Sequence, residues 1–359
     1  MVDWLAGKRV RGTSSERTPL GTAVDGTGVG GWVEVGRTTL GAASTTINVT
    51  SLPDKRYYMV LAYCDRDLVA TNTAMRMGNG SFDSGLNYAD RYQSDGAADA
   101  ITTSQTSMFG QLVADTNPNF SVGYLTNHSA SEKLWMNWVV HQRTAGAANV
   151  PTRREICSKH AFTLNPIDQL QFATLNSNEF QSGDEIVVLG WDPADTHTND
   201  FWEELASVEA SGSVASLESG TISAKKYLWI QCYISGTSAS TFCETLFNND
   251  IGANYVSRGS QNGGSDFTRT SQTDLNMFES YSNTTGAFLN AFIINNASNE
   301  KLGIAHSVRE ATSGASSAPQ RDEVVFKWTN TSSQITDISF TPQSGTINSG
   351  SILKVWGAD

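Results

Sequence analysis

The sequence contains few of the residues that mark a cross-linked or metal-binding protein. There are 4 cysteines and 8 prolines in 359 residues, and 17% of the residues are charged. A disulfide framework needs paired, regularly spaced cysteines, and a zinc site needs close spacing such as Cys-x-x-Cys. Because neither pattern is present, we expect free thiols and no metal or organic cofactor.

Long hydrophobic runs are also missing. No stretch reaches the roughly 18 apolar residues that a membrane helix needs, so membrane insertion is not expected. The first residues do not show the pattern of a secretory leader, which is a charged segment followed by a long apolar run. We therefore expect the protein to be made and assembled in a cytoplasm.

Positive charge is scarce except near the N-terminus. The net charge is −12, whereas a protein that binds nucleic acid needs a basic face, so nucleic acid is not an expected partner. Residues 1–30 are the exception, because this basic arm on an acidic body can dock onto a neighbouring subunit. The residues predicted to make that contact are Trp4, Lys8, Arg9, Arg11 and Arg17. The alternative is a solvated tail.

Glycine is abundant, with 31 residues, and Ser, Thr and Asn are frequent. This texture is typical of short strands joined by polar turns. Residues 57–64 and 227–234 each alternate two sets of large side chains, one for each face of a strand. Turn signals such as Asp95-Gly96 and Asn262-Gly263 separate the strand-like segments. Since sustained helical periodicity is missing, the sequence predicts an all-β protein with antiparallel strands.

The sequence also repeats itself once. Trp32 and Lys55 recur as Trp202 and Lys225, at an offset of 170 residues. Further matches follow in the same order at offsets of 167 or 168: Arg91 with Arg258, Thr103-Ser104-Gln105-Thr106 with Thr270-Ser271-Gln272-Thr273, Glu132-Lys133-Leu134 with Glu300-Lys301-Leu302, and Arg153 and Glu155 with Arg321 and Glu323. Ordered matches over the whole length indicate a duplication.

The repeat defines the predicted domains. One module covers residues 31–192, the other covers residues 201–359, and residues 193–200 form a linker too short to let the modules move far apart. A unit of about 160 residues is the size of a domain and exceeds a solenoid repeat. We predict two tandem antiparallel β-sandwich domains of jelly-roll type behind an extended arm.

Comparison of the two copies argues against catalytic cysteine or histidine. Cys64 and Cys157 align with isoleucine and valine, as buried free thiols do when they exchange with aliphatic side chains. His160 and His306 each align with a tryptophan. A histidine site needs oriented partners at defined spacing. We expect the cysteines to fill the cores and the histidines to be structural.

Carboxylate pairs could serve glycoside hydrolysis on a β fold. The candidates are Asp65, Asp67, Glu203, Glu204 and the two Arg-x-Glu pairs, Arg153 with Glu155 and Arg321 with Glu323. Residues i and i+2 of a strand share a face, and an arginine neighbour keeps a carboxylate ionised. A general acid needs a raised pKa. We therefore interpret the Arg-x-Glu pairs as surface ion pairs and keep a glycan hydrolase as a third hypothesis.

Two binding sites stay open as alternatives. Asp95, Asp99 and Asp266 lie in aligned glycine turns and are weak candidates for a calcium site, because calcium takes six to eight oxygen ligands. The tryptophans and tyrosines could form a glycan-binding surface. However, Trp135 and Trp138 would face opposite sides of a strand, and we expect Trp229 and Tyr233 to be buried between sheets.

Two segments resemble a known group of proteins. The opening Asp3-Trp4-Leu5, followed by Gly7-Lys8-Arg9-Val10-Arg11-Gly12-Thr13, is similar to the N-terminal segment of virion structural proteins from marine tailed phages and related viruses. Phe326-Lys327-Trp328 and Val355-Trp356-Gly357, near the end of the second module, resemble the same group, from which Lys159 and His160 of the first module depart. The resemblance implies a self-associating capsid or tail subunit and supplies no catalytic residues.

The leading hypothesis is a non-enzymatic virion structural protein, such as a capsid-decoration, shell accessory, tail or fibre subunit. Its expected partners are other copies of itself and other virion proteins. The alternative is a carbohydrate- or receptor-binding module displayed on the particle, with a host surface glycan as its partner. Both hypotheses place the protein in the virion after assembly in the host cytoplasm.

Overall fold

The computed structural model describes residues 31–65, 73–111, 117–175, 179–192, 200–278, 286–310, 315 and 317–359. These residues form 24 β-strands and no α-helix, which confirms the predicted all-β class. No helix in these ranges is long and apolar enough to cross a membrane. The arm residues Trp4, Lys8, Arg9, Arg11 and Arg17 lie outside the described ranges.

The first copy of the repeat forms twelve strands, β1 to β12: β1 (Val33–Thr39), β2 (Thr46–Val49), β3 (Tyr57–Cys64), β4 (Thr73–Gly78), β5 (Tyr88–Ser94), β6 (Ala100–Gln105), β7 (Met108–Gln111), β8 (Asn119–Thr126), β9 (Lys133–His141), β10 (Thr152–His160), β11 (Gln169–Thr174) and β12 (Glu185–Trp191).

The second copy forms β13 to β24: β13 (Glu203–Glu209), β14 (Leu217–Glu218), β15 (Tyr227–Ile234), β16 (Cys243–Phe247), β17 (Tyr255–Gln261), β18 (Phe267–Gln272), β19 (Leu275–Phe278), β20 (Ala287–Ile294), β21 (Lys301–Arg309), β22 (Gln320–Trp328), β23 (Ile338–Pro342) and β24 (Ile352–Ala358).

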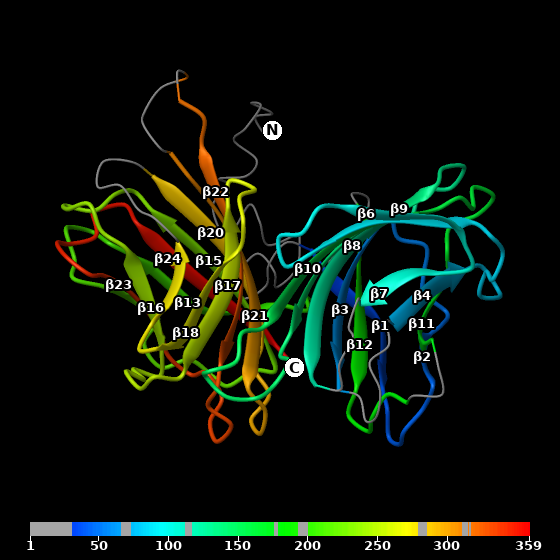
Figure 1. The fold of residues 1–359 in the computed structure, drawn as a ribbon, viewed down its shortest axis with the longest axis horizontal. Coiled ribbons are helices and arrows are strands. Elements are labelled where there is room, and N and C mark those ends of the chain that lie inside the picture. Colours follow the sequence, from blue (N-terminus) through cyan, green and yellow to red (C-terminus); the bar gives the residue numbers. More distant parts are fainter. Residues whose placement is uncertain are drawn as a thin grey trace, which may run out of the picture.

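Each copy folds into an antiparallel sandwich with the same topology. The large sheet of the first module has the order β1-β12-β3-β8-β9-β10-β5-β6, and its small sheet has the order β2-β11-β4-β7. The second module repeats both orders with every strand number raised by twelve. The chain passes back and forth between the two sheets, which is the winding of jelly-roll folds. Figure 1 shows the two sandwiches side by side.

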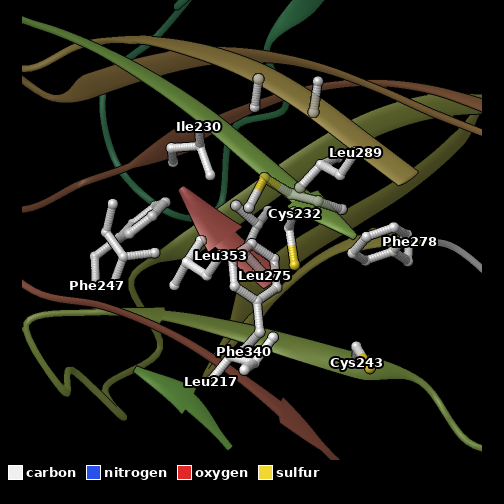
Figure 2. Packing of buried hydrophobic residues seen from close by; sticks show 14 of the residues in the cluster. Leu217, Ile230, Cys232, Cys243, Phe247, Leu275, Phe278, Leu289, Phe340 and Leu353 are labelled. Carbon is white, nitrogen blue, oxygen red and sulfur yellow. The ribbon is translucent and has the colours of Figure 1, made fainter. Parts of the chain in front are cut away.

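Alternation along the strands places one set of side chains between the two sheets of each sandwich. In β15, Leu228, Ile230, Cys232 and Ile234 enter the core of the second module, where they pack with residues of the small sheet such as Phe340. Figure 2 shows this core, with Ile230, Cys232 and Leu353 of the large sheet above Phe340 and Leu217 of the small sheet. The matching residues of β3 form the core of the first module.

Aligned positions keep their roles even where the residue type changes. The Nε2 atom of His160 lies 2.7 Å from an Asp83 carboxylate oxygen, and Trp328 Nε1 donates to Asp250 over the same 2.7 Å. Lys133 and Lys301 are both buried, and each donates three hydrogen bonds to backbone carbonyls. His160 is therefore a structural partner of Asp83, in line with the prediction.

The turns follow the predicted chemistry. Asp95 and Gly96 have φ values of 50° and 74°, and Asn262 and Gly263 have 53° and 72°. Two successive residues with positive φ define a type I′ turn, for which Asp-Gly and Asn-Gly are favoured. These turns connect β5 to β6 and β17 to β18.

The prediction for the cysteines is wrong at one position. All four are free thiols, and Cys64, Cys232 and Cys243 are buried as expected. Cys157, in contrast, is exposed, although its aligned residue Val325 is buried. The difference arises because Val325 lies under the neighbouring module, whereas Cys157 lies on a part of the equivalent face that the other module does not cover.

Candidate interaction site between the two modules

The two large sheets pack against each other through the faces that point away from their own sandwich cores. Strand β9 contacts β21 and β22, and β10 contacts β17 and β22. In Figure 1, β10 of the first module lies beside β17 of the second along this seam. The strands are therefore apolar on both faces, because one face fills a sandwich core and the other fills the seam. The double-sided apolar pattern of residues 57–64 and 227–234 has this physical origin.

A single apolar cluster spans the seam. From the first module it includes Met59, Leu61, Tyr63, Phe120, Val122, Val140, Val187 and Leu189, and from the second Trp202, Tyr227, Phe292, Ile294, Leu302, Ile304, Val325, Trp356 and Ala358. The rings of Trp138 and His306, which occupy aligned positions, meet edge to face at 5.0 Å. Burial lowers the pKa of His306 to about 4, so this imidazole is neutral at neutral pH.

The aromatic predictions are corrected in part. Trp135 lies in the sandwich core while Trp138 packs at the seam, as their opposite directions on β9 require. Trp229 is partly buried between sheets, as expected, but the two sheets are the large sheets of different modules. Tyr233 is exposed.

The connection between β9 and β10 is held by the second module. Lys327 Nζ donates to the Thr144 carbonyl at 2.8 Å, and the Gly146 amide donates to Glu300 Oε1 at 2.5 Å. Lys327 and Glu300 are also paired with each other at 3.2 Å and are almost fully buried. Burial lowers the pKa of Lys327, while Glu300 opposes that shift. Lys327 and Glu300 therefore provide the hydrogen bonds that water would otherwise make to the Thr144 carbonyl and the Gly146 amide of the first module.

Three further residues of the second module complete the contact. The Ser271 amide donates to the Ala147 carbonyl at 2.8 Å, and Arg258 Nε donates to the Pro151 carbonyl at 2.9 Å. Arg153, which follows this connection on β10, pairs with Asp266 at 2.8 Å. We call the five residues that hold the segment the peptide seat: Arg258, Asp266, Ser271, Glu300 and Lys327.

The Arg-x-Glu pairs also meet at the seam. Arg153 pairs with Glu155 and, at 3.1 Å, with Glu323 of the other module. Burial raises the pKa of Glu155 to about 7; Arg153 opposes this shift, and the neighbouring Glu323 adds to it. The prediction of a surface ion pair is therefore wrong for the first module, because Arg153 is buried between the sandwiches. Arg321, on the other hand, is exposed and pairs with Glu323 at 2.7 Å.

Glu185 provides a second polar contact across the seam. It accepts hydrogen bonds from the Tyr227 hydroxyl at 2.6 Å, from Lys226 Nζ at 2.9 Å and from Thr39. Burial alone would raise the pKa of Glu185, but these hydrogen bonds outweigh it and hold the pKa below its ordinary value. The carboxylate thus stays ionised in a nearly water-free site.

The calcium candidates face arginines. Asp95 and Asp266, from different modules, come together around Arg258 at 3.4 and 3.8 Å. Asp99 pairs with Arg91 at 3.2 Å on the first module. Within the described ranges no group of three or more His, Cys, Asp or Glu side chains is placed to hold a metal ion.

The other carboxylate candidates are dispersed. Glu203 pairs with Lys225, which precedes β15, and Glu204 pairs with Lys354 on the neighbouring strand β24. The amide of Asp65 donates to Asp184, and Asp67 lies outside the described residues. The structure therefore brings together only the Arg-x-Glu pairs with Asp95 and Asp266. Residue type alone did not single out Glu185, Glu300 or Lys327 as site residues, although Glu300 and Lys327 each stand opposite an identical residue in the repeat.

No family model and no curated protein matches the sequence. Among solved structures, mouse laminin α1 domains LG4–5 share 11% identity over 91% of both chains with a TM-score of 0.21. The laminin α2 LG1–3 region shares 8% identity over 87% of this chain and 64% of its own length, with a TM-score of 0.20. The Yersinia pestis protein Ail reaches a TM-score of 0.14 at 6% identity, over 80% of this chain and 99% of its own. These scores are too low to transfer a function.

Proposed function

We propose that the chain is a non-enzymatic structural subunit of a virus particle that associates with copies of itself and with other virion proteins. One observation carries the proposal: the outer face of the large sheet is an association surface, already used once between the two modules. Its chemistry is an aromatic and aliphatic centre with buried, paired charges at the rim, which is typical of permanent protein interfaces.

The state of the carboxylates supports a structural role. Retaining and inverting glycosidases need two carboxyl groups at a defined separation across an open cleft. Glu155 has a raised pKa, but it lies against Arg153 and Glu323 in the seam. The resemblance of the arm and of the second module to virion structural proteins points to the same role.

Two measurements test this proposal. Mass spectrometry of purified particles would detect the chain as a stoichiometric component, and light scattering of the purified chain would show masses above that of one 38.7 kDa subunit. A chain that stays monomeric at every concentration and is missing from particles would overturn the proposal. Turnover of a glycan panel that is lost in a single carboxylate variant would revive the enzyme hypothesis.

A glycan- or receptor-binding module is the second candidate, and one observation favours it. Tyr233 and Phe288 lie opposite each other on β15 and β20 and are both exposed. Exposed aromatic rings provide flat apolar surfaces on which sugar rings can stack. Binding to a glycan array that disappears in Tyr233→Ala, with the oligomeric mass unchanged, would support this function.

A further inference from the structure

The peptide seat of the second module exists a second time in the chain. Its five residues align with five identical residues of the first module. The offsets are 167 for Arg258, Asp266 and Ser271 and 168 for Glu300 and Lys327. The second copy consists of Arg91, Asp99, Ser104, Glu132 and Lys159, which we call the open seat.

The open seat is already formed but uncovered. Glu132 and Lys159 are paired at 3.0 Å with 41% and 50% of their side chains exposed, whereas Glu300 and Lys327 expose 4% and 0%. Ser104 has a φ of 54°, close to the 50° of Ser271. The same five side chains, with a similar φ at the serine, therefore form a second site for a ligand of the kind that the second module holds, namely a turn-containing backbone segment followed by an arginine.

Exposed apolar side chains surround the open seat. Leu134 and Met136 on β9 and Ile101 on β6 are 53%, 48% and 63% exposed, whereas Leu302 and Ile304, which align with the first two, are buried in the seam. The two modules touch at Trp138 and His306 and diverge beyond this pair, where exposed Tyr233, Phe288 and Val308 line the other module. Exposed large hydrophobic residues that gather in this way mark a binding surface.

The first described residues lie at the edge of this surface. The ring of Trp32 packs 6.2 Å from that of Tyr124, and Tyr124 is the register partner of Met136. The Trp32 carbonyl accepts a hydrogen bond from the Phe201 amide at 2.9 Å. Thirty residues precede this point, and an extended chain of that length spans about 100 Å, so the open seat is within reach.

We propose that the open seat binds the N-terminal arm, residues 1–30, of the same chain. The arm matches the two chemical requirements of the seat. It provides arginines for Asp99, as Arg153 does for Asp266, and it provides apolar side chains such as Trp4 for Leu134 and Met136. Its own chain is the preferred source, since covalent linkage raises the effective concentration of the arm at the seat to about 1 mM. The proposal is independent of the virion assignment.

The reactivity of the Cys157 thiol can report whether the arm covers the open seat. It lies in register between Met136 on β9 and Arg91 on β5, and it is the one exposed cysteine of the four. We would measure the rate at which a thiol reagent labels Cys157 in the full chain and in a chain that lacks residues 1–30. The expected result is faster labelling without the arm: at an effective concentration of about 1 mM, a dissociation constant of about 0.1 mM corresponds to about a tenfold difference in rate, and tighter binding to a larger one. Cys157→Ser, which should leave no fast-labelling thiol, sets the background.

Two variants and a peptide test the chemistry of the contact. Asp99→Asn combined with Glu132→Gln should speed the labelling of the full chain to the rate of the shortened one. Glu218→Gln, an exposed carboxylate on the small sheet of the other module, should change nothing. A synthetic peptide of residues 1–30 added to the shortened chain should restore protection, and a peptide with Arg9, Arg11 and Arg17 replaced by alanine should not.

Several outcomes would overturn the proposal. Equal labelling rates with and without the arm would show that the arm does not cover the seat. Protection that rises with protein concentration, together with a doubled mass in light scattering, would assign the seat to a second copy of the chain. Both outcomes differ from failure of the virion proposal, which is decided by the composition of purified particles.

Discussion

Glu155 makes the stability of the chain depend on pH in a way that one substitution can isolate. Its folded-state pKa of about 7 lies above the ordinary value of 4.5, because burial and Glu323 together outweigh Arg153. The folded state therefore retains a proton that the unfolded state has lost between pH 4.5 and pH 7. The contribution of this group to stability is complete below pH 4.5 and falls as the pH rises to 7.

The size of this effect follows from the shift. A difference of 2.5 pKa units corresponds to about 3 kcal/mol, so at pH 8 the ionised Glu155 costs the folded state an amount of that order. Glu155→Gln keeps the shape and removes the titration. We expect the variant to gain up to about 3 kcal/mol in unfolding free energy relative to the parent between pH 4.5 and pH 8.

The assay is urea denaturation of parent and variant at pH 4.5, 6 and 8, followed by tryptophan fluorescence. Titrating groups that do not interact with Glu155, such as Glu185 and His306, cancel in the comparison because both proteins contain them, whereas the repulsion between Glu155 and Glu323 is removed with Glu155 and belongs to the measured difference. Glu218→Gln serves as a matched control, because it makes the same change at an exposed carboxylate far from Glu155 in the sequence. A difference between Glu155→Gln and the parent that is the same at all three pH values would refute the reasoning.

Three further predictions concern the seam and its surroundings. Lys327→Met should lower the unfolding free energy by about 3 to 5 kcal/mol, because it leaves Glu300 buried without its partner; Lys159→Met, at the aligned exposed pair, should cost less than about 1 kcal/mol, and equal losses in urea denaturation would contradict this account. Trp202→Ala removes a buried seam residue and should cost about 3 to 5 kcal/mol, measured in the same way; a loss under 1 kcal/mol would mean that the seam contributes little to stability. Asp250→Ala leaves Trp328 Nε1 without an acceptor and should cost about 1 to 3 kcal/mol, and a thermal midpoint equal to that of the parent would contradict that role.

The fold was predictable because it depends on local patterns. Alternation in residues 57–64 and 227–234, the Asp-Gly and Asn-Gly turns, and the ordered repeat all act over short distances or through simple comparison of two copies. Such signals are sufficient for the fold class and for the tandem arrangement. The order of strands within each sheet was not predictable, since register across a sandwich depends on contacts far apart in the sequence.

The interaction site was less predictable, for a physical reason. A strand that is apolar on both faces looks the same whether its second face meets a sheet of its own sandwich or another module. The sequence therefore did not show which pair of sheets covers Trp229, and Arg153 was placed on the surface. The exposure of Cys157 could not be inferred from Val325. The two modules have the same fold, but each covers a different part of the other's outer face, so aligned residues differ in burial.

The identical five-residue seats have a consequence for how this protein can change over time. A substitution at Lys327 alters a contact that every folded chain must make, whereas the same substitution at Lys159 leaves the folded body intact. The seat of the second module is thus constrained by folding, while the open seat is constrained only through the segment that it binds. The duplication therefore places two copies of one binding site in a single polypeptide. One copy holds a segment of the folded body, and the other can change by substitution without unfolding that body.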